Sequence, residues 1–312
     1  MSESNKRNFI VHGSILAIAG ILVRIIGMLY RIPVVNIIGS EGNGIYGAAF
    51  NIYNIMLVLS SYGLPMAVSK LVSARFTKKR YKSAAKVLRC SLMVAVCTGG
   101  IAALLVFFGA SFIENVIYGG GLPGLAVPLR ILAPTIFLVA ILGVIRGFFQ
   151  GQSTMIPTAV SQILEQIVNA IVSIAAGYGM MKAFASLPDV AAYGAAGSTL
   201  GTAMGALTAV LFMGFLYAVY TPTFNRLKRK DRHTENQSTG QICKIIIYTM
   251  IPIILGQTFY QISALIDDVM FSNIMVGRDI TKSISMDLGN FSSSYSLLIG
   301  IPQGVASAMS AS

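Results

Sequence analysis

The chain has 312 residues, of which 55% are hydrophobic and 11% are charged. A soluble domain carries roughly 25% charged residues, so this composition excludes an ordinary soluble fold and indicates an integral membrane protein. The net charge of +12 would suggest nucleic acid in a soluble protein. In a membrane protein basic residues collect in cytoplasmic loops instead, so we expect no nucleic-acid partner.

Seven apolar stretches are long enough to cross a bilayer as helices, which takes about 20 residues. They lie at roughly 9–37, 44–69, 87–113, 125–147, 155–181, 195–220 and 242–266, and an eighth begins near 291. The first is too long for the core of a signal peptide and has no convincing cleavage site, so we expect it to be retained. The fold class predicted is an all-α, polytopic membrane protein.

Connections rich in lysine and arginine alternate with connections poor in them. The N-terminal tail and the second-to-third, fourth-to-fifth and sixth-to-seventh connections hold most of the 23 basic residues. By the positive-inside rule, these connections lie in the cytoplasm. We therefore expect a cytoplasmic N-terminus.

A short self-match suggests an internal repeat. The sequence Gly63–Val68 at the end of the second span resembles Gly300–Val305 in the eighth, at an offset of 237 residues. Because six spans separate the copies, both point the same way, as in parallel repeats. We expect residues 1–237 to form one six-helix lobe and residues 238–312 to begin a second. About four spans of that second lobe would then be absent, so the chain is expected to be a fragment of a two-lobe protein.

Small residues on the sixth span form a stripe in which Gly197, Gly201 and Gly205 recur every four residues. Such a stripe lets another helix backbone approach closely. We interpret it as a helix-packing surface.

Two arginines lie inside the first predicted span. Arg24 is near its middle and Arg31 is seven residues on, almost two helical turns, so both guanidinium groups share one helix face. A charge at this depth costs about 3 kcal/mol on insertion scales, and such groups face a bundle interior or a watery cavity. Arg31 could also snorkel toward the interface.

Polar residues mark the fifth and seventh spans. Gln162, Glu165, Gln166 and Asn169 form a stripe at helical spacing on the fifth span. It would line a cavity, or it would form a hydrogen-bond network between helices in which Glu165 neutralises an arginine. On the seventh span Gln261 falls on the counterpart of Arg24 at the 237-residue offset, while Asp267 and Asp268 lie near the outer end.

Two arginines facing a cavity suit an anionic ligand. Guanidinium holds phosphate bidentately and stays ionised at any depth, unlike lysine. The substrate class that follows is a phosphate- or pyrophosphate-bearing amphiphile whose head group must cross the bilayer.

The residues that would indicate an enzyme are missing. His12 and His233 form no metal site with the three cysteines, which we interpret as small buried apolar residues. No G-x-x-x-x-G-K-[ST] motif is present, so we expect no ATP binding by that route. We predict a protein that is not an enzyme and has no cofactor and no metal.

Several motifs in this chain resemble the polysaccharide-biosynthesis flippases of the multidrug/oligosaccharidyl-lipid/polysaccharide exporter superfamily, especially the branch with stage V sporulation protein B and the lipid II flippases. They are RIP at 31–33, GSEGNGIY at 39–46, YGLPMAVSKLVS at 62–73, RGFFQGQ at 146–152 and IPTAVSQILEQ at 156–166. The resemblance implies about fourteen helices in two lobes around a cationic cavity, in a bacterial plasma membrane.

The resemblance also implies alternating access and a lipid-linked substrate, lipid II or another undecaprenyl-pyrophosphate glycan. Arg24 and Arg31 would hold the pyrophosphate, Gln162, Glu165 and Gln166 would shape the cavity, and Gln261 would face it from the second lobe. The chain departs from related sequences at Asn169, where a basic residue is often found.

Two other functions stay open at this point. A cation-coupled drug exporter of the same superfamily would need a first lobe lined by carboxylates, whereas the charges on the first span are positive. A non-transporting membrane scaffold for cell-wall or spore assembly would tolerate neutralisation of Arg24.

Overall fold

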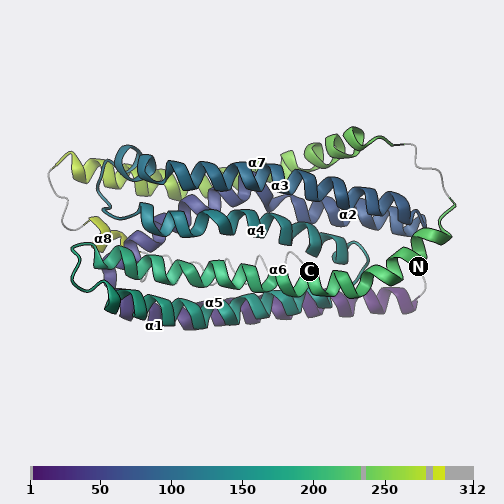
Figure 1. The fold of residues 1–312 in the computed structure, drawn as a ribbon, viewed down its shortest axis with the longest axis horizontal. Coiled ribbons are helices and arrows are strands. Elements are labelled where there is room, and N and C mark those ends of the chain that lie inside the picture. The colour runs from purple at the N-terminus through teal and green to yellow at the C-terminus, as the bar shows by residue number, and fades with distance from the viewer. Residues whose placement is uncertain (1–2, 233–236, 279–283, 292–312) are drawn as a thin grey trace.

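The computed structural model describes residues 3–232, 237–278 and 284–291, and all regular structure in these ranges is helical (Figure 1). This confirms the predicted all-α class. The α-helices are Glu3–Leu57 (α1), Leu64–Thr77 (α2), Tyr81–Phe112 (α3), Ala126–Gln150 (α4), Ile156–Ala183 (α5), Val190–Lys230 (α6), Thr239–Val276 (α7) and Ile284–Phe291 (α8). Two π-helical turns, Val58–Tyr62 and Ile113–Ile117, extend α1 and α3.

Six helical stretches in the described ranges are long and apolar enough to cross a membrane. The first, Ile18–Thr77, has 60 residues, which would make a straight helix about 90 Å long. A bilayer core is only about 30 Å thick. The backbone leaves the helical conformation at Gly39, with φ 70° and ψ 178°, a region open to glycine because it has no Cβ. The chain turns back there, so this stretch supplies the first two predicted spans.

The remaining predicted spans, from the third to the seventh, fall within α3, α4, α5, α6 and α7. The short helix α8 ends at Phe291, where the eighth predicted span begins. That span and the second copy of the repeat at 300–305 lie outside the described residues.

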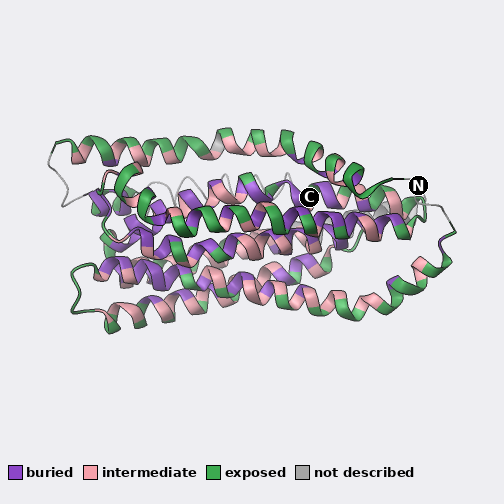
Figure 2. Cartoon of the chain, turned by 45° about the horizontal axis from the view of Figure 1, so that its top comes forward, coloured by how far each residue is buried: buried purple, intermediate pink, exposed green. Residues whose placement is uncertain are grey.

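Large apolar side chains lie on the outside of the bundle as well as in its interior (Figure 2). Phe108 and Phe259 are 76% and 77% exposed. Soluble monomers rarely expose large contiguous apolar patches, whereas a bilayer solvates them. The packing inside is divided between two clusters of buried residues, one around Ile45, Leu129 and Ile136 and the other around Leu64, Val87 and Phe148.

The glycine stripe predicted on the sixth span is where α6 packs against α5. A Cβ at Gly205 would lie 2.6 Å from the backbone oxygen of Glu165, and a Cβ at Gly201 would lie 2.6 Å from that of Asn169. Real Cβ atoms do not approach this closely, so only glycine permits the contact. The stripe thereby fixes the rotation of α5, which carries the polar residues described below.

The predicted basic connections lie at one end of the bundle. The α2–α3, α4–α5 and α6–α7 connections all lie at the end where the chain begins, on the right in Figure 1. The Gly119–Gly121 segment and the α5–α6 connection lie at the other end. The alternation along the sequence therefore becomes a charge difference between the two ends of the molecule.

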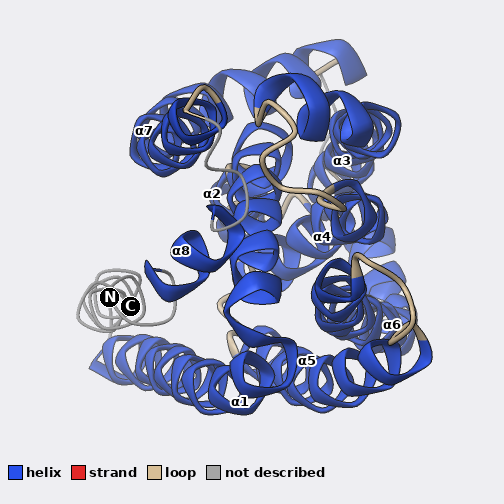
Figure 3. Ribbon diagram, turned by 90° about the vertical axis from the view of Figure 1, so that its left-hand side faces the viewer, coloured by secondary structure: helices blue, strands red, loops and turns tan. Residues whose placement is uncertain are grey.

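Helix α7 is attached to the preceding helices at both ends. Near its start Ile242 and Ile246 are buried in the cluster formed with α2 and α3. Near its end Ser272 Oγ donates to the backbone oxygen of Tyr118 at 2.8 Å, and Asn273 Nδ2 donates to that of Ile117 at 2.8 Å. Figure 3, seen along the bundle, shows α7 at the upper left and α1 along the bottom, with α8 near the gap between them.

Candidate functional site

The predicted arginines Arg24 and Arg31 lie on one face of α1, away from its exposed apolar stripe. That stripe consists of Ile18, Leu22, Ile25, Leu29 and Ile32. With 3.6 residues per turn, the two arginines lie roughly 20° apart and about 130° from the centre of the stripe. Arg24 is exposed and Arg31 is half-buried. The face that carries the guanidinium groups is therefore distinct from the face suited to acyl chains.

Arg31 is held by an aromatic ring and retains an open donor. Its Cζ lies 5.5 Å from the ring centroid of Tyr46, a cation–π contact. Tyr46 follows the bend at Gly39, so the reversal of the chain brings it back onto Arg31. The Nε of Arg31 is buried and has no hydrogen-bond partner among the described residues. Buried donors are nearly always paired, so this one is suited to an acceptor supplied by a ligand or water.

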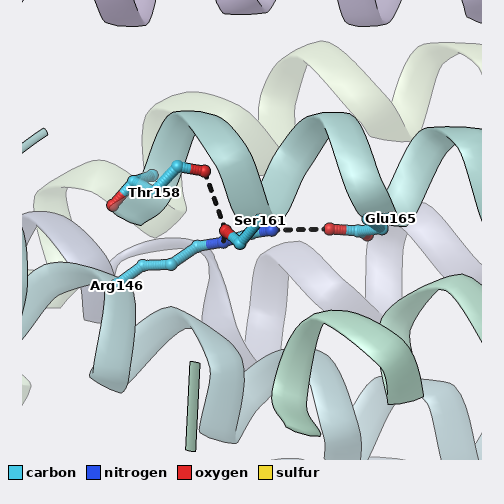
Figure 4. A network of polar contacts seen from close by, with 4 residues as sticks. All are labelled: Arg146, Thr158, Ser161 and Glu165. Atoms are coloured by element: carbon cyan, nitrogen blue, oxygen red, sulfur yellow. Dashed lines mark hydrogen bonds and ion pairs between the residues drawn. The ribbon is translucent and has the colours of Figure 1, made fainter. Parts of the chain in front are cut away.

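Glu165 pairs with Arg146 on α4 (Figure 4). Arg146 Nη2 lies 2.7 Å from Glu165 Oε2, and their side chains are 14% and 27% exposed. Arg146 Nε also donates to Ser161 Oγ at 2.9 Å, and that hydroxyl donates to the backbone oxygen of Thr158 at 2.8 Å. These contacts join α4 to α5. They are of the kind expected from a network between helices, and they leave the carboxylate neutralised.

The basic residues counted for the fourth-to-fifth connection include Arg146, but it lies inside α4, four positions before the helix ends at Gln150. A charged residue so near the end of an apolar helix resembles the flank of a span when only one helix is considered. Its partner Glu165 is 19 residues away along the chain. The polar spacing on the fifth span was the one signal that could have suggested the pair.

Two other polar residues of α5, Gln166 and Asn169, contact α1. Gln166 Nε2 lies 3.0 Å from the position a Cβ would take at Gly27, a residue between Arg24 and Arg31 on α1. One turn on, Asn169 Nδ2 donates to the Tyr30 hydroxyl at 3.3 Å. Gln162 is half-buried on the same helix. The structure thus brings Gln166 next to the arginine-bearing face, while no described contact joins Gln162 to it.

Asn169 is at the centre of a second hydrogen-bond network. Its Oδ1 accepts from Ser173 Oγ at 2.9 Å and from Thr202 Oγ1 at 3.5 Å, and Ser173 Oγ also lies 2.8 Å from the backbone oxygen of Ser198. Asn169 is buried. The amide of Asn169 therefore links α1, α5 and α6.

Helix α7 contributes a polar contact that differs from the predicted one. Gln261 is half-buried and has no described contact with Arg24 or Arg31. Two turns further on, Asn51 Nδ2 donates to Asp268 Oδ2 at 2.5 Å and joins α1 to α7. The neighbouring Asp267 is exposed, whereas Asp268 is half-buried.

The described residues include no group of three or more histidine, cysteine or acidic side chains that could hold a metal ion. The three cysteines are free. The expectation that all of them are buried is confirmed for Cys90 only. Cys243 is half-buried and Cys97 is exposed, because a lipid-facing position is also apolar.

Comparison with known proteins identifies a family. The family described as "Polysaccharide biosynthesis protein" matches residues 10–312. Among curated proteins of Bacillus subtilis (strain 168), the chain is 34% identical to "Lipid II flippase MurJ" over 176 residues, or 54% of this chain and 32% of that protein. It is 31% identical to "Stage V sporulation protein B" over 209 residues, or 67% of this chain and 39% of that protein.

An "Uncharacterized membrane protein YabM" from the same organism is 27% identical over 279 residues, which cover 89% of this chain and 50% of that protein. The chain therefore spans half the length, or less, of these curated relatives.

Solved transporter structures share the fold. An inward-facing structure of a multidrug resistance MATE family transporter of the MOP superfamily superposes with a TM-score of 0.64 and 17% identity, over 94% of this chain and 64% of that chain. An outward-facing structure of such a transporter gives a TM-score of 0.65 and 18% identity, over 96% and 63%. At this level of sequence identity, the comparison shows that the helices are arranged in the same way.

Proposed function

The chain belongs to the polysaccharide biosynthesis protein family, and from this membership we propose that it is part of a flippase for a lipid-linked cell-wall precursor. Residues 1–237 form its first lobe and residues 238–312 begin the second. The substrate is lipid II or another undecaprenyl-pyrophosphate-linked glycan, moved outward by alternating access. The similarity to proteins named lipid II flippase and stage V sporulation protein B supports this substrate class.

One observation carries the proposal: two guanidinium groups share a face of α1, away from the apolar stripe, and have no acidic partner among the described residues. Two carboxylates inside the bundle are engaged elsewhere, Glu165 by Arg146 and Asp268 by Asn51. A pyrophosphate would supply the missing negative charge and an acceptor for Arg31 Nε. Gln166, which abuts α1 between the arginines, would add an amide donor.

The remaining predicted residues act around this centre. Glu165 holds Arg146 and so positions α5 without contacting the anion. Gln162, on the same helix, lines the cavity, and Gln261 faces the substrate path from α7. A cation-coupled exporter is less well supported, because Glu165, the acidic residue of α5, is already neutralised. Transport needs no ATP site, no metal and no cofactor in this scheme.

The charged end of the bundle lies in the cytoplasm of a bacterial cell. The basic connections at the end where the chain begins support this orientation through the positive-inside rule. The inner leaflet then faces the N-termini of α3 and α7, and the lipid-linked substrate enters from that side.

The test is complementation of a Bacillus strain depleted of its lipid II flippases by the complete open reading frame that contains this chain. The unsubstituted protein should rescue growth, Arg24→Ala should not, and Arg24→Lys should rescue partly because lysine lacks the bidentate fork. Arg130→Ala is the matched control, since Arg130 is an exposed arginine at the other end that donates a hydrogen bond to Ser111 at 2.9 Å.

Membrane levels of each variant are measured by immunoblot. Rescue by Arg24→Ala at normal levels would overturn the anion-binding role. Failure of the unsubstituted protein to rescue, at normal levels, would overturn lipid II as the substrate.

A further inference from the structure

A cavity of about 480 Å³ lies at the basic end of the bundle, between the first turns of α3, the last turns of α6 and the start of α7. Its lining includes four cationic side chains: Lys82, Lys86 and Arg89 of α3 and Lys228 of α6. Within the part of the chain that the structure describes, no acidic side chain lines it. It belongs to different helices from Arg24 and Arg31, since α1 and α3 lie on opposite sides of the bundle in Figure 3.

The four cations are not neutralised by carboxylates within the described residues. Lys86 Nζ donates to the backbone oxygen of Gln237, and Lys228 Nζ lies 5.2 Å from the ring centroid of Phe224. The neighbouring Asp231 is buried, and its Oδ2 accepts from the backbone N–H of Lys82 at 2.8 Å. A concave site with this charge attracts anions.

Three further lining residues are apolar. Ala85, Cys90 and Met93 of α3 line the cavity, and Met93 is 57% exposed. Lys82 and Met93 are eleven residues apart, or about 16 Å along the helix. Lys82, Lys86 and Arg89 therefore lie toward the end of the bundle, and Cys90 and Met93 follow them toward its middle, in the order of the head group and acyl chain of a membrane lipid.

We propose that this cavity binds an anionic glycerophospholipid, with its phosphodiester among the four cations and its upper acyl chain on Met93 and Cys90. Basic pockets between helices at the cytoplasmic side of membrane proteins recognise such head groups. A free phosphate would use the cations alone and would leave the apolar part unfilled. The choice of the inner leaflet rests on the orientation proposed above, whereas the ligand chemistry does not.

The site also spans the junction of the two proposed lobes. Thr239, at the first turn of α7, lines the cavity together with α3 and α6. Cys90 Sγ lies 3.8 Å from the backbone oxygen of Thr239. A lipid bound here contacts both α3 of the first lobe and the start of α7, so it would hold the junction together.

The experiment uses the full chain purified in a mild zwitterionic detergent, with lipid binding measured by native mass spectrometry. The probes are dioleoyl-phosphatidylglycerol, dioleoyl-phosphatidylcholine and inorganic phosphate. We expect retention of phosphatidylglycerol but not of phosphatidylcholine, and no displacement by millimolar phosphate. Lys82→Gln/Arg89→Gln, which removes two of four cations, should weaken phosphatidylglycerol binding about thirty-fold.

Arg226→Gln/Arg229→Gln is the matched control, because it removes the same charge from exposed residues at the same end that do not line the cavity. It should bind phosphatidylglycerol as the unsubstituted chain does. Equal weakening in both variants would reduce the effect to net charge and overturn the site. Displacement by phosphate, or equal retention of phosphatidylcholine, would overturn the phospholipid as ligand.

If the double variant does not fold, two single substitutions test the same proposal. Arg89→Gln alone should weaken phosphatidylglycerol binding about five-fold. Met93→Asn should weaken lipid binding while leaving the cations in place. Unchanged binding in both, with helicity verified by circular dichroism, would overturn the proposal.

Discussion

Arg146 and Arg24 both lie on apolar helices, but their surroundings differ. Arg146 meets Glu165 at 2.7 Å and Ser161 at 2.9 Å, and its side chain is 14% exposed. Arg24 is exposed on α1 and has no hydrogen-bond or ion-pair partner among the described residues. A guanidinium with a carboxylate partner joins two helices, whereas one without such a partner is available to an anion that arrives from outside. The depth of an arginine in a span therefore does not distinguish these roles, and its neighbours do.

The largest effect on stability is expected when Arg146 loses its carboxylate partner. Glu165→Ala leaves Arg146 as a largely buried charge without its partner, which should lower the free energy of unfolding by about 3 kcal/mol. Urea titration in detergent, followed by circular dichroism, measures it. The double variant Arg146→Met/Glu165→Leu should recover most of the loss, since it removes both charges. A loss below 1 kcal/mol in Glu165→Ala would mean that the pair contributes little.

A smaller effect should follow when α6 is forced away from the backbone of Glu165. Gly205→Ala places a Cβ 2.6 Å from the Glu165 oxygen and should cost about 2 kcal/mol. Gly214→Ala on the same helix is the matched control, because a Cβ there has no neighbour within 4 Å, and it should be neutral or slightly stabilising. The same unfolding titration compares them, and equal losses would mean that the α5–α6 contact is looser than it is in the structure.

The contact between Arg31 and Tyr46 is expected to be weaker still. A double-mutant cycle with Tyr46→Leu and Arg31→Met should give a coupling energy of about 0.5–1 kcal/mol. Tyr46→Phe keeps the ring and serves as the control, with a coupling near zero. A coupling of zero for Tyr46→Leu would show that Arg31 is held by other groups.

The smallest change in stability is expected at the unpaired arginine. Arg24→Ala should alter the free energy of unfolding by no more than about 0.5 kcal/mol, because the side chain is exposed and makes no described polar contact. Urea titration against the unsubstituted chain measures this. The same substitution should abolish complementation, so activity and stability separate at Arg24 and fall together at Glu165. A loss of 2 kcal/mol or more in Arg24→Ala would place Arg24 in a structural contact and remove the contrast.

Much of the fold could be predicted because it depends on local chemistry. Apolar runs of about 20 residues have few ways to satisfy their backbone in lipid except as helices, so the spans followed from hydropathy. The packing role of Gly201 and Gly205 followed from their four-residue spacing, and a Cβ at either position would meet α5. The alternation of basic connections likewise predicted that they share one end of the bundle.

The partners of the charged residues could not be predicted in the same way. Glu165 and Arg146 lie on different helices, so spacing along either helix does not reveal their contact. The internal repeat placed Gln261 at the counterpart position of Arg24, but no described contact joins Gln261 to Arg24. Nothing in the sequence indicates that Asp268 accepts a hydrogen bond from Asn51, which is 217 residues away. Spacing along one helix predicts which residues share a face, but not which helix covers that face.

Sequence by itself therefore determined the helical membrane class, the spans, the charged end and the shared face of Arg24 and Arg31, because each depends on the solvent that a segment meets and on the helical period. Only the tertiary structure decided that Glu165 belongs to Arg146, that the bend at Gly39 returns Tyr46 to Arg31, and that four cations of α3 and α6 surround one cavity. These depend on how separate helices pack, and a charge pairs with the group that packing places within about 4 Å of it.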